Sequence, residues 1–307
     1  MQHGTFAESA DIPAYRSTGA EWQVRLLQSK CYWHDQTEDV IDTIDRRDEI
    51  AAELLRMKQV VAEHHDLRFV YFICSRRRVR FSPSYLPQYS SVTRQLTYYL
   101  EVGADKELMK VTTPIRTILD EPKIRFTERA LAYQQDSKRN ILGSVHEFHH
   151  YNAVGLGFAS KVHYIGFSES PSREVIQSTH GGLAATLRNV SRAENDIFHY
   201  YNLFEVAHAA RESTRDEGQI LEDALVYYFK PDQQFCQQNA VDLKARLAAL
   251  GRDLEVDSVG VKVQSEYQNE YFRFFSTAVS AANAHEFWLD PATAEMTAVA
   301  AGSDDPG

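Results

Sequence analysis

The sequence predicts a helix-dominated α+β fold, with one long helix beside a small sheet of short strands. Apolar residues recur at helical spacing over most of the chain, which favours amphipathic helices. β-branched and aromatic residues are concentrated in a few short runs, which is typical of strands. We expect a single globular domain over residues 1–290, because a chain of 307 residues can bury a sizeable core. Residues 291–307 are rich in small residues and acidic near the end, so they are expected to be a disordered tail.

In the first half of the chain, predicted helices lie on either side of two short strands. Apolar residues at helical spacing predict a helix over 39–61. The runs 67–74 and 79–81 are expected to be strands that form a hairpin or an edge pair. A second helix is predicted over 91–102. The longest helix is expected over 127–155, from a threonine cap to an end weakened by glycine.

The second half is expected to be mainly helical. A short strand is predicted over 161–167, and the pattern over 173–229 is mainly that of helices interrupted at glycines. Another helix is predicted over 241–250, closed by a glycine. The alternating run 256–263 predicts a strand, and 267–282 is expected to be helical again.

The composition is that of an ordinary globular protein and argues against nucleic acid as a partner. The chain carries 33 Lys and Arg against 43 Asp and Glu, a net charge of −10, which repels a phosphate backbone. The local exception is the basic group Arg76, Arg77, Arg78 and Arg80. Beside aromatic residues this group could bind phosphates, but such a run is more typical of a solvated strand edge.

Cysteine usage and hydropathy indicate the compartment. The chain has 3 cysteines, an odd number at wide spacing, so they predict neither a disulfide framework nor a cysteine-type zinc site. The longest apolar run, 69–74, is too short to span a bilayer, and the amino terminus lacks the pattern of a signal peptide. We therefore expect a cytoplasmic protein without a membrane partner.

The chemically most specific pattern is His146-Glu147-Phe148-His149-His150, which has the form H-E-x-x-H. On a helix the two outer histidines lie one turn apart and can bind the same zinc ion, while the glutamate projects towards a metal-bound water. A shuffled chain of this composition would contain the pattern about 0.04 times. It therefore stands out above every other motif in the chain.

On these five residues the chain resembles the zincin metallopeptidases. The resemblance implies that His146 and His150 bind zinc and that Glu147 is the general base for the bound water. Family members need a third protein ligand further along the chain. Glu174 is favoured, because Ser172 can cap a helix that carries it, and His180 is the rival. The implied function is zinc-dependent hydrolysis of an amide bond in a peptide or protein.

Two other functions remain open from the sequence. Glu147-x-x-His150 and Glu205-x-x-His208 together have the form of a di-iron carboxylate site, which would make the protein an iron-dependent oxidase or oxygenase. However, E-x-x-H is expected about 0.9 times by chance in this composition, so the pair carries less weight. The third possibility is a helical scaffold or assembly protein without catalytic activity. The sequence does not determine the oligomeric state.

Overall fold

The protein is dominated by sheet. The structure, a computed structural model, describes residues 20–171, 181–207, 215–232 and 240–299. Strands make up 42% of it and helices 27%. The prediction of a helix-dominated fold with a small sheet is therefore wrong.

An eight-stranded curled sheet forms the larger part of the molecule. In spatial order its strands are β13 (Phe274–Phe275), β10 (Ser160–Phe167), β2 (Leu67–Arg77), β11 (Asn195–Ala207), β1 (Ala20–Trp33), β12 (Val256–Gln264), β14 (Ala284–Asp290) and β15 (Glu295–Val299). Neighbours are antiparallel, except that β12 is parallel to β1 and β13 is parallel to β10. The last strand, β15, lies within the tail that the sequence predicts to be disordered.

Helices pack on both faces of this sheet, so its central strands are apolar on both sides. On one face lie α3 (Arg47–Glu63) and α5 (Gly181–Asn189), and on the other lie α6 (Arg215–Phe229) and α8 (Ala240–Asp253). Successive residues of β2 alternate between the two cores. Phe69, Tyr71 and Ile73 pack with α3 and α5, whereas Val70, Phe72 and Cys74 pack with α6 and α8.

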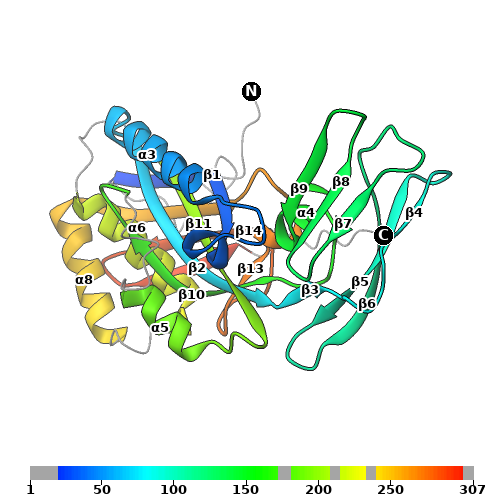
Figure 1. The fold of residues 1–307 in the computed structure, drawn as a ribbon. Helices are drawn as coiled ribbons and strands as arrows, with labels where there is room; N and C mark the ends of the chain where they lie inside the picture. The colour runs from blue at the N-terminus through cyan, green and yellow to red at the C-terminus, as the bar shows by residue number, and fades with distance from the viewer. Residues whose placement is uncertain (1–19, 172–180, 208–214, 233–239, 300–307) are drawn as a thin grey trace.

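Two smaller sheets lie to one side of the large one (Figure 1). The first consists of β3 (Val79–Phe81), β4 (Gln88–Ser90), β5 (Gln95–Val102) and β6 (Glu107–Pro114), and the second of β7 (Ile124–Phe126), β8 (Ala130–Gln134) and β9 (Asn140–Ser144). They share a core that also contains Val145 and Phe148 of the short helix α4 (Val145–Tyr151). Two further short elements are α2 (His34–Glu38), directly after β1, and the 3-10 helix η3 (Glu270–Phe272). Helix α4 thus stands at the boundary between the small sheets and the large one.

Several predicted elements are confirmed and others are wrong. The helices over 39–61 and 241–250 are present as α3 and α8, and the strands over 67–74, 79–81, 161–167 and 256–263 as β2, β3, β10 and β12. The two strands expected to pair as a hairpin do not pair, because β3 pairs with β5. The helices expected over 91–102 and 267–282 are absent; the first segment contains β5 and the second contains η3 and β13.

The long helix predicted over 127–155 is replaced by a hairpin and a two-turn helix. The Asp136 carboxylate accepts hydrogen bonds from the backbone N–H groups of Lys138 and Arg139, each at 2.8 Å, and so makes the turn between β8 and β9. Ser144 then caps helix α4, which begins at Val145. The second half of the predicted helix is therefore a strand, β9, followed by the short helix α4.

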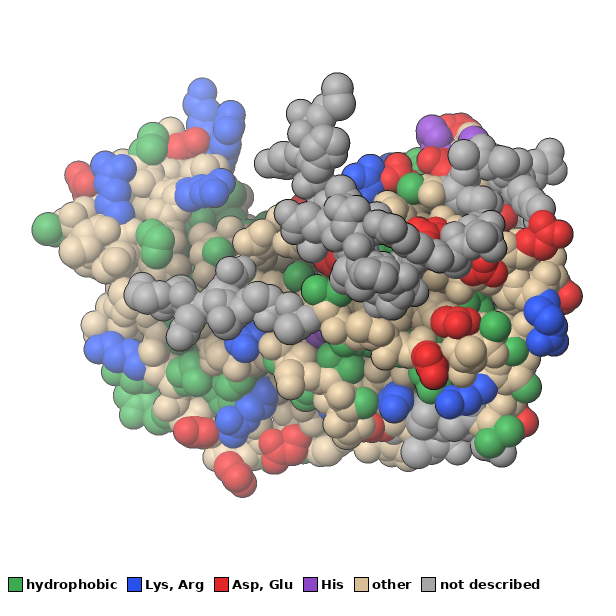
Figure 2. All heavy atoms as spheres, turned by 180° about the vertical axis from the view of Figure 1, so that it is seen from behind, with side chains coloured by type: hydrophobic (Ala, Val, Ile, Leu, Met, Phe, Trp, Pro, Cys, Tyr) green, Lys and Arg blue, Asp and Glu red, His purple; other side chains and the backbone are tan. Residues whose placement is uncertain are grey.

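The arginines of the run 76–80 do not form one exposed basic patch. Arg76 and Arg80 are buried in ion pairs with Glu270 and Asp196, and Arg77 pairs at the surface with Glu107. On the face opposite that of Figure 1, acidic and basic side chains are interspersed over the described residues (Figure 2). Among the helices of the described chain, none is long and apolar enough to cross a membrane.

Candidate functional site

A cavity of about 460 Å³ opens where two parallel strands of the large sheet separate. Strand β1 pairs with β11 up to Trp33, but it pairs with β12 only up to Arg25. A bulge between Leu26 and Gln28 follows that point and shifts the alternation of side chains. The far edge of β1 is then free of β12, and consecutive residues from Ser29 to Trp33 line the cavity.

The H-E-x-x-H residues reach this cavity because α4 has a strong start signal. The Ser144 hydroxyl accepts a hydrogen bond from the Glu147 N–H at 3.2 Å, and the Glu147 carboxylate accepts one from the Ser144 N–H at 2.7 Å. This reciprocal pair is a capping box. It fixes the short helix so that His146, Glu147 and His150 all line the cavity.

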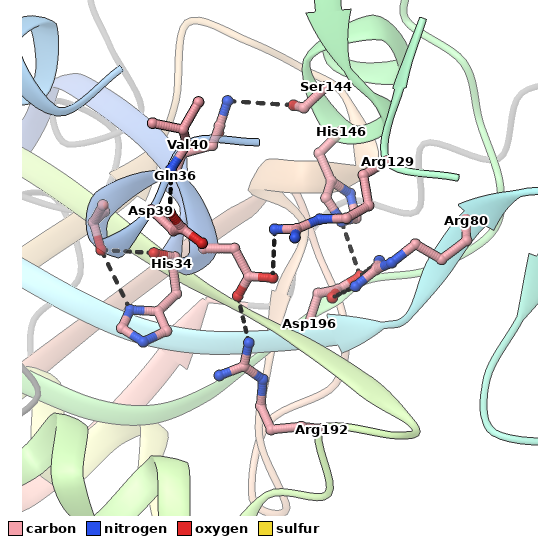
Figure 3. Close-up of polar contacts among 12 residues, drawn as sticks. His34, Gln36, Asp39, Val40, Arg80, Arg129, Ser144, His146, Arg192 and Asp196 are labelled. Carbon is pink, nitrogen blue, oxygen red and sulfur yellow. Dashed lines mark hydrogen bonds and ion pairs between the residues drawn. The ribbon is translucent and has the colours of Figure 1, made fainter. Parts of the chain in front are cut away.

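His146 is buried and both of its ring nitrogens have partners. Its Nε2 lies 2.9 Å from Asp196 Oδ2 at the start of β11, and its Nδ1 lies 3.2 Å from the Tyr271 hydroxyl in η3. Figure 3 shows His146 directed at Asp196, which Arg80 also contacts. Burial lowers the pKa of His146, and the bond to Asp196 offsets part of that shift.

The Asp196 carboxylate is ionised although it is buried. Burial alone raises its pKa, but hydrogen bonds from His146 and Arg80 lower the pKa below the usual range for aspartate. Arg80 donates from two nitrogens to the two carboxylate oxygens, both at 2.8 Å. Asp196 therefore accepts from His146, which assigns the proton of the neutral imidazole to Nε2 and leaves Nδ1 to accept from Tyr271.

His150 has one nitrogen fixed and one open to the cavity. The Asn269 side chain donates from Nδ2 to His150 Nδ1 at 3.0 Å, and its Oδ1 is fixed by the Tyr271 N–H. Among the described residues His150 Nε2 has no hydrogen-bond partner, and it is not enclosed. Burial lowers the pKa of His150, so the ring is neutral at pH 7 and presents an Nε2–H donor.

The predicted general base, Glu147, is engaged at both carboxylate oxygens. One accepts from the Ser144 N–H, and the other accepts from Arg46 Nε at 2.9 Å. The two predicted zinc ligands share a cavity, but His146 Nε2 is held by Asp196. Among the described residues no group of three His, Cys, Asp or Glu side chains is placed to hold a metal ion. A zinc site would require His146 and Glu147 to leave these partners.

The other four predicted ligands are placed as follows. Glu174, the favoured third zinc ligand, and its rival His180 lie outside the described residues. Glu205 lies near the end of β11, where it pairs with Arg25 of β1, and His208 lies outside the described residues. Glu205 itself lies in a strand, so the Glu205 half of a di-iron site lacks the helix on which its spacing was based.

The remaining cavity wall combines a buried aromatic interior with a charged rim. Trp33, Phe198, Tyr271 and Phe272 are each at most 2% exposed. The indole Nε1 of Trp33 has no hydrogen-bond partner within the described part of the chain, which is costly for a buried donor.

Three basic and three acidic side chains form the rim. Arg46 pairs with Glu49 and Glu147, and Arg56 pairs with Glu53. The third base, Lys30, makes no ion pair with a described residue, although its charge lowers the pKa of His150. Lys30 is thus the rim cation with the most freedom to bind a ligand.

Glu270 fixes the loop after α4 against η3. One of its carboxylate oxygens accepts from the N–H groups of Leu156 at 2.6 Å, Gly157 at 2.7 Å and Phe158 at 3.3 Å. The other oxygen accepts from Arg76 at 2.6 Å. These contacts hold Asn269 beside His150 and Tyr271 beside His146.

Most of this site has no local signal in the sequence. Lys30, Asp196, Asn269 and Tyr271 are far apart in the chain, and no spacing motif joins them. The start of α4 did carry a signal, because Ser144-x-x-Glu147 has the form of a capping box. Comparisons with protein-family models, curated proteins and solved structures find no match to this chain.

Proposed function

We propose that the cavity between β1, α3 and α4 binds a small, flat molecule that carries a carboxylate. The observation that carries this proposal is an aromatic interior joined to a rim on which Lys30 lacks an ion-pair partner among the described residues. A volume of about 460 Å³ lies in the range of small-molecule sites. The ring would lie against the aromatic side chains, and the carboxylate would meet Lys30.

One further group supports a ligand of this class. The His150 Nε2–H is a neutral donor at the cavity. A ligand with an oxygen acceptor satisfies this donor. The rim side chains of α3 and of the preceding Arg46 are already paired with one another or with Glu147.

The test is the binding of aromatic carboxylates to Lys30→Met. Benzoate and 4-hydroxybenzoate should bind to the wild-type protein in calorimetry or ligand-observed NMR. Lys30→Met should weaken binding by about tenfold, which corresponds to about 1.4 kcal/mol. Lys58→Met is the matched control, because Lys58 is exposed on α3 and does not line the cavity. Equal binding to all three proteins would contradict the proposal.

Zinc-dependent hydrolysis of an amide bond, in a cytoplasmic protein, remains our second proposal. It is favoured by one observation, that His146, Glu147 and His150 line the same cavity. If it is right, purified protein should bind zinc near one equivalent, and His146→Gln and His150→Gln should each lose it. Glu147→Gln should keep zinc but lose hydrolysis of a peptide. Absence of zinc from wild-type protein in metal analysis after incubation with zinc would contradict this proposal.

A further inference from the structure

We propose that Tyr271 is the general base of the cavity and that His146 and Asp196 position and activate it. This inference rests on the proposed binding of a small carboxylate and adds the reaction class, abstraction of a proton from an acidic C–H or O–H of that ligand. Tyr271 and His146 both line the cavity. The hydrogen bonds run from the Tyr271 hydroxyl to His146 Nδ1 at 3.2 Å, and from His146 Nε2 to Asp196 at 2.9 Å.

The proton can move along this chain without a co-reactant. As the ligand's C–H or O–H bond breaks, its proton joins the Tyr271 oxygen, and the hydroxyl proton of Tyr271 passes to His146 Nδ1. The electron pair of the broken bond stays on the ligand. The imidazolium that forms is stabilised by the ionised Asp196, as in other acid–base systems where a carboxylate orients a histidine. Arg80 keeps Asp196 in place and ionised.

A cation also lies against the tyrosine ring. The Arg76 guanidinium carbon is 3.9 Å from the centroid of the Tyr271 ring. The Tyr271 hydroxyl donates to His146 Nδ1 in the resting site, so charge builds up on its oxygen only when that proton moves to His146. A cation beside the ring favours that transient negative charge.

A second histidine–tyrosine hydrogen bond, away from the cavity, serves as a structural comparison for the contact between His146 and Tyr271. His149 Nε2 lies 3.0 Å from the Tyr98 hydroxyl, and both side chains are buried. His149 Nδ1, however, has no partner among the described residues, and neither residue lines the cavity. Among the described residues, two histidine–tyrosine hydrogen bonds join side chains that are both buried, and only the one at the cavity has a carboxylate behind the imidazole.

The test uses 4-(fluorosulfonyl)benzoate, which carries a flat ring, a carboxylate and an electrophile that reacts with phenols. Attack by the Tyr271 oxygen forms an S–O bond, the S–F bond breaks, fluoride leaves, and the phenol proton passes to His146. Tyr32, Tyr151 and Tyr267 line the same cavity without a histidine–carboxylate pair. Peptide mapping of wild-type protein should find the adduct on Tyr271, formed about 100-fold faster than on the other three. This comparison requires no variant to fold.

Variants separate activation from binding. His146→Gln should lower the maximal labelling rate of Tyr271 by about 100-fold, whereas His149→Gln, a matched change in the other pair, should leave it unchanged. Lys30→Met should raise the probe concentration that gives half-maximal labelling and leave the maximal labelling rate unchanged. If the labelling rate of wild-type protein does not saturate with probe concentration, that result would count against the binding proposal alone. An adduct on Lys30 or Tyr267 in place of Tyr271, no adduct, or undiminished labelling in His146→Gln would overturn the assignment of Tyr271.

Discussion

At the scale of single residues, two buried carboxylates, Asp196 and Glu270, join segments that are distant in the sequence. Asp196 ties β11 to α4 and β3 through His146 and Arg80, and Glu270 ties η3 to β2 and to the loop after α4. A buried charge with complete partners is tolerated, but removing one member leaves the other uncompensated. These residues therefore control both the stability of the junction and the position of the cavity side chains.

Glu270→Gln should destabilise the protein by about 3 kcal/mol, because Arg76 then becomes a buried charge without its counter-ion. The measurement is the free energy of unfolding from urea titration. Glu107→Gln is the control, since the pair of Glu107 with Arg77 is exposed and should contribute less than about 1 kcal/mol. If both variants lost the same stability, the Glu270 carboxylate would not have the role assigned to it.

At the scale of elements, the sequence predicts correctly where one signal acts alone. Helix α3 is apolar on one stripe only, and β12 alternates, so each has the period of its structure. Strand β5 shows the limit. Leu96, Tyr98, Leu100 and Val102 are buried at every second position, yet the pairs Leu96–Leu100 and Tyr98–Val102 also have the i, i+4 spacing of a helix. Strand pairing with β6 and β3 decided the outcome.

Strand β11 was missed for a different reason. It lies between β1 and β2 and is buried on both faces, with nine consecutive buried residues from Asp196 to Phe204. A run without alternation carries no strand period, so Ile197, Tyr201 and Phe204 could be taken for a helical stripe. The di-iron interpretation depended on the same mistaken helix, because it placed Glu205 on a helix where the structure has a strand.

The candidate site was predictable only in part. The residues of the H-E-x-x-H motif lie on a helix and three of them line a cavity, and spacing on a helix is local information. The partners of His146 come from β11 and η3, and the cavity itself opens where β1 stops pairing with β12. The end of that pairing follows from strand register and a bulge, which are tertiary features without a local sequence signal.

At the scale of the whole molecule, buried neutral histidines link folding to pH. His285 is the clearest case, since its Nε2–H donates to the Phe274 carbonyl at 3.0 Å and its Nδ1 contacts the Tyr228 hydroxyl at 3.2 Å. Burial lowers the pKa of His285 from 6.5 to about 4. Burial lowers the pKa of His34 and of His163 to about 4 as well.

Because these histidines bind protons more weakly in the folded state than in the unfolded chain, their stabilising effect is complete above pH 6.5. It is lost as pH falls towards 4. Between pH 7 and pH 4.5, His285 alone should account for about 2 kcal/mol of lost stability. The free energy of unfolding can be measured by urea titration at both pH values. Its decrease from pH 7 to pH 4.5 should be about 2 kcal/mol smaller in His285→Gln than in wild type. His64→Gln, at an exposed position of the surface, should match wild type. An acid loss in His285→Gln equal to that of wild type would show that His285 does not link folding to pH.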